Sequence, residues 1–535
     1  MGNSEAITYT VGAGLRYRFM RFDYAYVAPP TLPASSRFSF ALAFNPFSSR
    51  VRIVEAPRIE PVFPAFRRRY QGLEPITRVK LVNQDDRPHQ AVLSLHVPGL
   101  MDAPVEKQIV LRPKEIREVA VDTVVFAEGI VGLTEPRLAQ AQLKVSYSTE
   151  QGTRSHQRRA PLFVYGRNST QWDDVGKAAA FITSTDPLVE GFARPVLAAF
   201  EADIESLGKG VANLLRAMAL FEALRRHGVR YVADPNSPYA EKAADRAAVD
   251  DIQFPAELLH SRTGDCDDLT VLFCALLESA GIATALVDFP GHIFMAFDSG
   301  VSRYQLEHLP LAEHRYLVWG DRVWIPVEVT LLDRPFIQAW DSGAEELGQL
   351  ARPQIRQRLV ETAQAWRQYA PAGPVFDWEI APPVRASFEA DFAAQQLELE
   401  SQFDAFIQNT YLDPLENPPE DVELRFVLAR LYAALHRYDQ ALDQYRRIEG
   451  GDRAGVRNNM GIIYFLQGDP ERAAAHFEEA AALRPEDREI RRNLDRALRA
   501  LGRPGRLAEA VPARGEEPGK AAADNLDVDS FYWAE

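Results

Sequence analysis

The sequence predicts a multidomain α+β protein in which β-strands come first, a mixed α+β core follows, and helices complete the chain. Three observations support this fold class. Up to about residue 166, short runs alternate apolar and polar residues, a period of two that is typical of strands. Between residues 175 and 340, one strongly helical segment lies among strand-like runs. After residue 341 the apolar spacing is helical, and part of it repeats near the C-terminus.

The composition limits the classes of function. The 535 residues correspond to three or four domains of ordinary size, and 46% hydrophobic with 25% charged residues is typical of a globular chain. The 60 Lys and Arg against 75 Asp and Glu give a net charge of −15, which argues against nucleic acid as a partner because phosphates need cationic side chains. The two cysteines, Cys266 and Cys274, are too few for a disulfide framework or a Cys-rich zinc module, and we expect no cofactor and no metal.

The first region, residues 1–50, contains three strand-like segments rich in aromatic residues, at 7–19, 22–26 and 38–44. They are similar to the wall of an outer-membrane β-barrel, and Phe44 is similar to its terminal aromatic residue. Three strands cannot close a barrel. Either they are the remnant of a barrel that belongs to a longer protein, or they form an amphipathic edge sheet packed on the next domain. The first alternative implies a periplasmic or outer-membrane-associated protein, and the cytoplasm is the other possibility.

Residues 56–166 are expected to form a β-sandwich of immunoglobulin-like type. Short alternating runs at 77–81, 93–97, 115–121 and 141–147 are separated by turns rich in Gly, Pro and Asp, with no helical period between them. This region contains no constellation of catalytic side chains. The next region, 175–340, does.

The most informative segment of that core begins a helix at a cysteine. Asp265 is a good N-cap, and Asp268 completes an acidic first turn ahead of a helical apolar stripe, which places Cys266 at the first helical position. The positive end of the helix dipole favours a thiolate there. Asp265, Asp267 and Asp268 oppose it, so a reactive thiolate needs an imidazolium nearby.

The segments that follow supply one. A strand over 283–288, a turn at Pro290-Gly291, a strand from His292 and a hairpin over 316–328 would bring His292 and Glu328 together on neighbouring strands beneath Cys266. A thiol, an imidazole and a carboxylate in that arrangement are the nucleophile, base and orienting group of a catalytic triad.

The three segments 264–268 (GDCDD), 290–294 (PGHIF) and 324–330 (WIPVEVT) resemble, in order and spacing, the core motifs of bacterial transglutaminase-like proteins. The resemblance implies a papain-like α+β core in which Cys266 is the nucleophile, His292 the general base and acid, and Glu328 the group that orients the imidazole, where many members have Asp. It implies acyl transfer on protein or peptide amides through a thioester. Water would make the protein a protease or amidase, and an amine would make it a cross-linking enzyme.

The oxyanion of that reaction needs hydrogen-bond donors. One candidate is the backbone N–H of Cys266 at the start of the helix, and the second is Gln253 or His260, which lie just upstream. Cys274 lies in the middle of the apolar helix and is expected to be a core residue. The thiolate, imidazole and carboxylate of the triad are also zinc ligands, but we favour the catalytic interpretation.

Residues 341–415 are expected to form a helical linker. Residues 418–502 then contain a repeat that resembles tetratricopeptide repeats and implies a protein partner. Residues 503–535 are expected to be a disordered tail.

The alternative to an enzyme is a non-catalytic envelope scaffold that binds proteins through the sandwich and the repeats. The repeat signature pairs residues 32 apart, such as 429 and 461, and consists of Ala429, Tyr432, Ala441 and Tyr445, matched by Gly461, Tyr464, Ala473 and Phe477, with Pro485 ending the second repeat.

Overall fold

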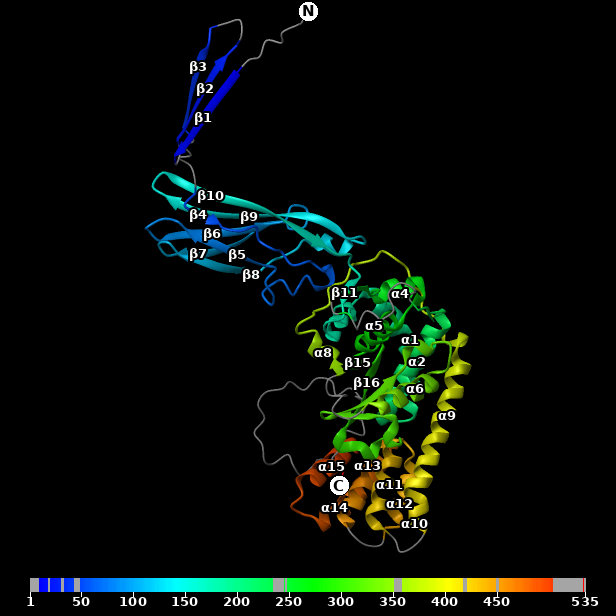
Figure 1. Cartoon of the computed structure of the whole chain (residues 1–535). Coiled ribbons are helices and arrows are strands. Elements are labelled where there is room, and N and C mark those ends of the chain that lie inside the picture. The colour runs from blue at the N-terminus through cyan, green and yellow to red at the C-terminus, as the bar shows by residue number, and fades with distance from the viewer. Residues whose placement is uncertain are drawn as a thin grey trace, which may run out of the picture. The chain divides into compact units, whose positions relative to one another are not determined.

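The computed structural model describes residues 9–17, 20–29, 33–42, 49–233, 245, 248–350, 358–416, 421–448, 452–503 and 533 (Figure 1). Its contacts divide the chain into two units. One consists of Met1–Pro61, Glu74–Ala127 and Leu138–Phe163, and the other of Val62–Leu73, Glu128–Arg137 and Val164–Glu535. The six-region division stays a prediction, and Phe44 and nearly all of the tail lie outside the described residues.

In the first unit, the N-terminal strands form an antiparallel sheet in the order β1-β2-β3. The strands are β1 (Tyr9–Tyr17), β2 (Met20–Ala28) and β3 (Ser35–Leu42). Aromatic and aliphatic side chains of all three strands are exposed, among them Val11, Phe22 and Phe40. The outer-membrane association stays a prediction.

Two antiparallel sheets complete this unit, in the orders β10-β9-β6-β7 and β4-β5-β8. Along β5 and β6 every second residue is buried, as expected where one face of each sheet is covered. Three of the strands, β4, β7 and β10, lie outside the runs that the sequence predicts. The strands are β4 (Val51–Ile53), β5 (Thr77–Asn83), β6 (His89–His96), β7 (Val105–Leu111), β8 (Ile116–Val121), β9 (Arg137–Thr149) and β10 (Gly152–Val164).

The second unit is built on a five-stranded antiparallel sheet in the order β17-β18-β16-β15-β19. The β15–β16 hairpin turns at Gly291, whose positive φ of 80° suits glycine. The strands are β15 (Thr284–Phe289), β16 (His292–Ser302), β17 (Leu317–Trp319), β18 (Arg322–Val327) and β19 (Leu359–Glu361), and the shorter pairs are β11 (Ser169–Gln171) with β13 (Val249–Asp251) and β12 (Arg230–Tyr231) with β14 (Thr263–Gly264).

Apolar side chains cover both faces of this sheet. Met295 and Ile325 belong to the main core together with Leu272 of α5, whereas Phe294 and Trp324 pack with Leu347 of α6 on the other face. The strands therefore position the ends that carry His292 and Glu328 rigidly between helices. Those helices are α1 (Pro187–Ser206), α2 (Ala212–His227), α4 (Pro255–Ser261), α5 (Cys266–Ser279) and α6 (Phe336–Gln349) (Figure 1).

The segment 341–415 is not the purely helical linker that the sequence predicts. After α6, residues 359–361 form β19, which pairs with β15 because that strand would otherwise be an open edge of the sheet. Residues 370–384 have no regular structure. The helices here are α8 (Thr362–Ala365), the long α9 (Glu389–Ile407), which Figure 1 shows in yellow, and α10 (Asp413–Glu416).

The C-terminal helices pack in antiparallel pairs. Ala429, Ala441 and Ala473 are completely buried, and a Cβ on Gly461 would lie 2.7 Å from the ring of Phe477, so small residues let the helices approach as the repeat signature requires. Among the described residues, no helix is long and apolar enough to cross a bilayer. The helices are α11 (Val422–Ala434), α12 (Tyr438–Arg446), α13 (Arg453–Leu466), α14 (Pro470–Leu483), which ends just before Pro485, and α15 (Arg488–Ala500).

Candidate active site

Cys266 is the first residue of α5, and the structure of the preceding turn fixes it there. Asp265 caps the helix, since its carboxylate accepts a hydrogen bond from the Asp268 backbone N–H at 3.4 Å, and its own N–H donates to the Asp268 carboxylate at 3.3 Å. Gly264 has no room for a side chain, because a Cβ would lie 2.6 Å from Leu258 and 2.7 Å from Asp268. Packing therefore requires glycine at 264, and the helix cap requires a side chain such as that of Asp265.

His292 and Glu328 lie on the neighbouring strand ends of β16 and β18. His292 Nε2 donates a hydrogen bond to Glu328 Oε2 at 2.5 Å. The other oxygen, Glu328 Oε1, accepts hydrogen bonds from the backbone N–H and the hydroxyl of Thr330, at 2.9 and 2.5 Å. Glu328 is 3% exposed. Its side chain, although longer than that of Asp, reaches the His292 imidazole, and both of its carboxylate oxygens accept hydrogen bonds.

The same imidazole also contacts the thiol. Burial disfavours the charged imidazolium, but hydrogen bonds with Cys266 and Glu328 and their negative charges outweigh it and raise the pKa of His292 to about 10. A hydrogen bond from the Thr270 hydroxyl to the Ile293 carbonyl, at 3.3 Å, ties α5 to the start of β16. Thiol, imidazole and carboxylate thus lie close together, and their catalytic roles stay a prediction.

The aspartates beside the thiol carry less negative charge than the sequence suggests. Asp267 is completely buried, and burial together with the Asp265 charge raises its pKa well above the ordinary value. Burial also raises the pKa of Asp268, to about 7, against hydrogen bonds from Gln253. Burial therefore favours the neutral acid at Asp267, and the charge that opposes a Cys266 thiolate is reduced.

The two predicted side-chain donors for the oxyanion have other partners. Gln253 Nε2 donates to the Thr263 carbonyl at 2.9 Å and to the Asp268 carboxylate at 2.7 Å, which leaves neither amide hydrogen for an oxyanion. The imidazole of His260 stacks on Trp378, with the ring centres 4.4 Å apart. The backbone N–H of Cys266 remains a suitable donor, because the first N–H groups of a helix have no acceptor within it.

Two residues that the sequence did not single out also face the site. Tyr231 pairs with Gly264 in the parallel β12–β14 pair, and burial and the nearby charges of Cys266 and Asp265 raise its pKa. A carboxyl oxygen of Glu346 of α6 lies within 4.8 Å of one of Glu328, and burial and the Glu328 charge raise the pKa of Glu346. Neither could be found from the motifs, because the first depends on a two-residue strand pair and the second on the direction of a helix.

Within the part of the chain that the structure describes, two groups of side chains have ligand atoms within 4.8 Å of one another, the distance at which they could share a cation. One consists of His292, Glu328 and Glu346, and the other of Asp265, Asp267 and Asp268. In the first group His292 and Glu328 are hydrogen-bonded to each other, and in the second Asp265 and Asp268 form the helix cap. We assign no cation to either group, and the expected absence of a metal stays a prediction.

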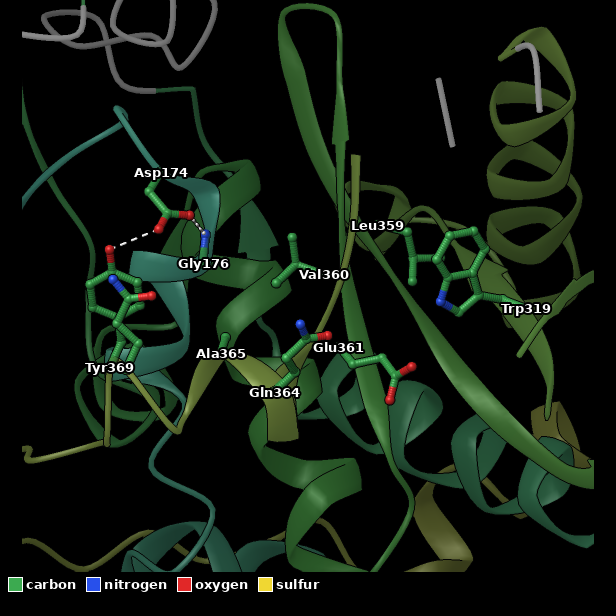
Figure 2. Close-up of a pocket in the computed structure, with 10 residues that line it drawn as sticks. Asp174, Gly176, Trp319, Leu359, Val360, Glu361, Gln364, Ala365 and Tyr369 are labelled. Atoms are coloured by element: carbon green, nitrogen blue, oxygen red, sulfur yellow. Dashed lines mark hydrogen bonds between the residues drawn. The ribbon is translucent and has the colours of Figure 1, made fainter. Parts of the chain in front are cut away.

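A separate cavity of about 350 Å³ is lined by residues of β19, α8 and the neighbouring loops, and none of the three triad residues lines it. Figure 2 shows the Tyr369 hydroxyl directed at Asp174, to which it donates a hydrogen bond at 2.8 Å. The Asp174 carboxylate also accepts a bond from the Gly176 N–H at 2.9 Å. Both hydrogen bonds therefore link residues of the cavity wall to one another.

Comparison with known proteins adds information on the C-terminal part. Residues 423–486 match the tetratricopeptide repeat family, which confirms the predicted repeats. The human protein O-mannosyl-transferase TMTC1 is 34% identical over 76 residues, which are 14% of this chain and 9% of that protein. The chain thus spans about a tenth of that relative's length. The transglutaminase-like resemblance stays a prediction, whereas α11 to α14 form tetratricopeptide repeats, which generally mediate binding between proteins.

Proposed function

We propose that the core is a transglutaminase-like thiol enzyme that transfers acyl groups from protein or peptide amides through a thioester on Cys266. One observation carries the proposal, namely that His292 is hydrogen-bonded to a buried, doubly anchored Glu328 while the neighbouring Cys266 thiol also raises its pKa. A histidine that only fills the core needs one hydrogen-bond partner, not a thiol on one side and a buried carboxylate on the other. The raised pKa of His292 favours the imidazolium, which is the form that stabilises a neighbouring thiolate.

In this mechanism the Cys266 sulfur attacks the amide carbonyl carbon, and the C–S bond forms as the carbonyl oxygen takes up negative charge. The Cys266 backbone N–H faces that charge, and the Tyr231 hydroxyl is a second candidate donor. Collapse breaks the C–N bond, and the His292 imidazolium gives its proton to the departing amine. Neutral His292 then takes a proton from the water or amine that attacks the thioester. The C–S bond breaks, the acid or the new amide is released, and the thiolate–imidazolium pair is restored.

Alkylation of the thiols tests this proposal directly. Iodoacetamide is added between pH 6 and 9, and the peptides of Cys266 and Cys274 are followed separately by mass spectrometry. Cys266 should react at the acid end of this range, and His292→Ala should remove that reactivity. Cys274 is completely buried, and burial raises its pKa strongly, so it serves as an unreactive internal reference. His260→Ala is the matched control, because its ring stacks on Trp378.

A Cys266 that reacts no faster than a free thiol, and equally in His292→Ala, would overturn the enzyme proposal. If it is reactive, unfolded protein substrates with a biotinylated alkylamine separate the two reactions. Fragmentation indicates hydrolysis, incorporation of biotin indicates transamidation, and Cys266→Ala should abolish either.

The repeats favour protein binding as a second function, because they match a family whose surfaces bind other proteins. We infer that they recruit the substrate or a partner of the enzyme. If Cys266 proves unreactive, the same repeats support the alternative of a non-catalytic scaffold.

A further inference from the structure

One face of helix α6 packs against the end of β18, where Glu328 lies. The Glu328 backbone N–H donates a hydrogen bond to the Ala339 carbonyl at 2.9 Å. One turn on, Gly343 lies against the same strand end, where a Cβ would come within 2.9 Å of the Val327 nitrogen and 3.0 Å of the Glu328 nitrogen. Glu346 is three residues further along, on the same face.

This packing places the Glu346 side chain next to Glu328. An imidazole nitrogen of His292 and a carboxyl oxygen of each of Glu328 and Glu346 lie within 4.8 Å of one another. Among the described residues, Glu346 Oε2 is a buried atom for which the geometry finds no hydrogen-bond donor. Two ionised carboxylates cannot bond each other, because neither carries a hydrogen. A proton on Glu346 supplies the missing donor.

We propose that Glu346 is a positioning residue of the site, whose neutral carboxyl donates a hydrogen bond to Glu328 and whose ionisation places a second negative charge behind the His292 imidazolium. The inference deepens the proposed function and rests on it for its importance, but its test does not depend on enzymatic activity. The site would thus be a relay of four side chains, with Glu346 acting on the thiol only through Glu328 and His292.

The charges around Glu346 set the pH at which this change occurs. Burial and the Glu328 charge raise the pKa of Glu346, the His292 charge lowers it, and the hydrogen bond with Glu328 and the charge of Glu345 raise it further, giving a value of about 7. Cys266 affects the pKa of Glu346 only indirectly, because the thiol acts on His292. Below that pH one carboxylate faces His292, and above it two do, so the imidazolium is held more strongly on the alkaline side.

The test follows the His292 imidazole by NMR of protein labelled with ¹³C at Cε1 of histidine, from pH 5 to 11, with His292→Asn to assign the signal. The wild type should show two inflections, one near pH 7 from Glu346 and one near 10 from His292 itself. Glu346→Gln keeps a donor but cannot ionise, so it should lose the first inflection and titrate at lower pH in the second. Glu345→Gln is the control, because it removes the same charge from the adjacent, exposed position of α6.

A wild-type titration without an inflection near pH 7 would overturn the proposal, and it needs no variant to fold. An inflection of undiminished size in Glu346→Gln would overturn it equally, because it would then come from another group near the site, such as Asp268, whose pKa is also about 7. If the first inflection disappears in Glu346→Gln alone while Cys266 proves unreactive, Glu346 is a member of the cluster and it is the enzyme function that fails.

Discussion

The pair of His292 and Glu328 makes the stability of the fold depend on pH. The pKa of His292 is raised from 6.5 to about 10 in the folded protein, and Glu328 is one of the groups that raise it. A raised folded-state pKa means that the pair stabilises the fold fully below pH 6.5, and that this stabilisation is lost as the pH rises through about 10.

We therefore expect Glu328→Gln to lower the melting temperature more at pH 6 than at pH 10.5, because the amide keeps the shape but not the charge. Thermal unfolding at the two pH values measures this. Glu345→Gln, at an exposed position, should show no such difference. An equal loss at both pH values would mean that Glu328 acts by packing alone.

At this scale the sequence was informative where a residue's role depends on its neighbours in the chain. Asp265, Cys266 and Asp268 lie within one helical turn, so the helix cap and the place of Cys266 at the helix start could be predicted. The partners of Gln253 could not, because Asp268 is fifteen residues away along the chain and reaches it only through the fold. Glu346 was missed for the same reason, since nothing in its own segment distinguishes it from Glu345.

At the scale of elements, α6 carries the clearest consequence. Gly343 allows the helix to touch the β18 strand end, whereas a Cβ on Gly348 of the same helix would have nothing within 4 Å of it. Gly343→Ala should cost about 1–3 kcal/mol of unfolding free energy through overpacking. Gly348→Ala should instead stabilise by about 0.5–1 kcal/mol, because alanine is the better helix former.

Urea unfolding of the two variants measures these free energies, and the two glycines serve as controls for each other. Gly343→Ala should also displace Glu346 from Glu328 and weaken the inflection of His292 near pH 7. Equal effects of the two substitutions would contradict the close docking of α6.

Strands and helices with a strong period could be predicted at this scale, among them α5, β15, β16 and the repeat helices. β19 could not, because 359–361 lies among helix-forming residues and becomes a strand only by pairing with β15. Pairing with the open edge of a sheet outweighs a weak local preference.

At the scale of the second unit, the repeats are packed on the core. Buried apolar residues of α5, α9 and α11 belong to one continuous cluster, and Arg430 of α11 donates a hydrogen bond to Glu307 at 3.1 Å. The tetratricopeptide helices should therefore unfold together with the core. The sequence could predict both parts from their motifs, but not this junction, since Glu307 belongs to no motif.

Gly208 is the most constrained point of that junction. Its φ is 84°, and a Cβ there would overlap the carbonyl oxygen of Ala434 at the end of α11. Gly228 has a similar φ of 90° but nothing within 4 Å, so it isolates the cost of backbone strain, about 1–3 kcal/mol. Gly208→Ala adds the overlap to that strain and should separate the repeats from the core.

Differential scanning calorimetry should show one cooperative transition for the second unit of the wild type and of Gly228→Ala. Gly208→Ala should show two, with an earlier transition in which hydrogen exchange increases across α11 to α15 but not across α5 and β16. Because Cys266 and His292 lie on those core elements, alkylation of Cys266 should be unchanged below the second transition. A single transition in Gly208→Ala, shifted no further than in Gly228→Ala, would show that the repeats do not depend on this junction.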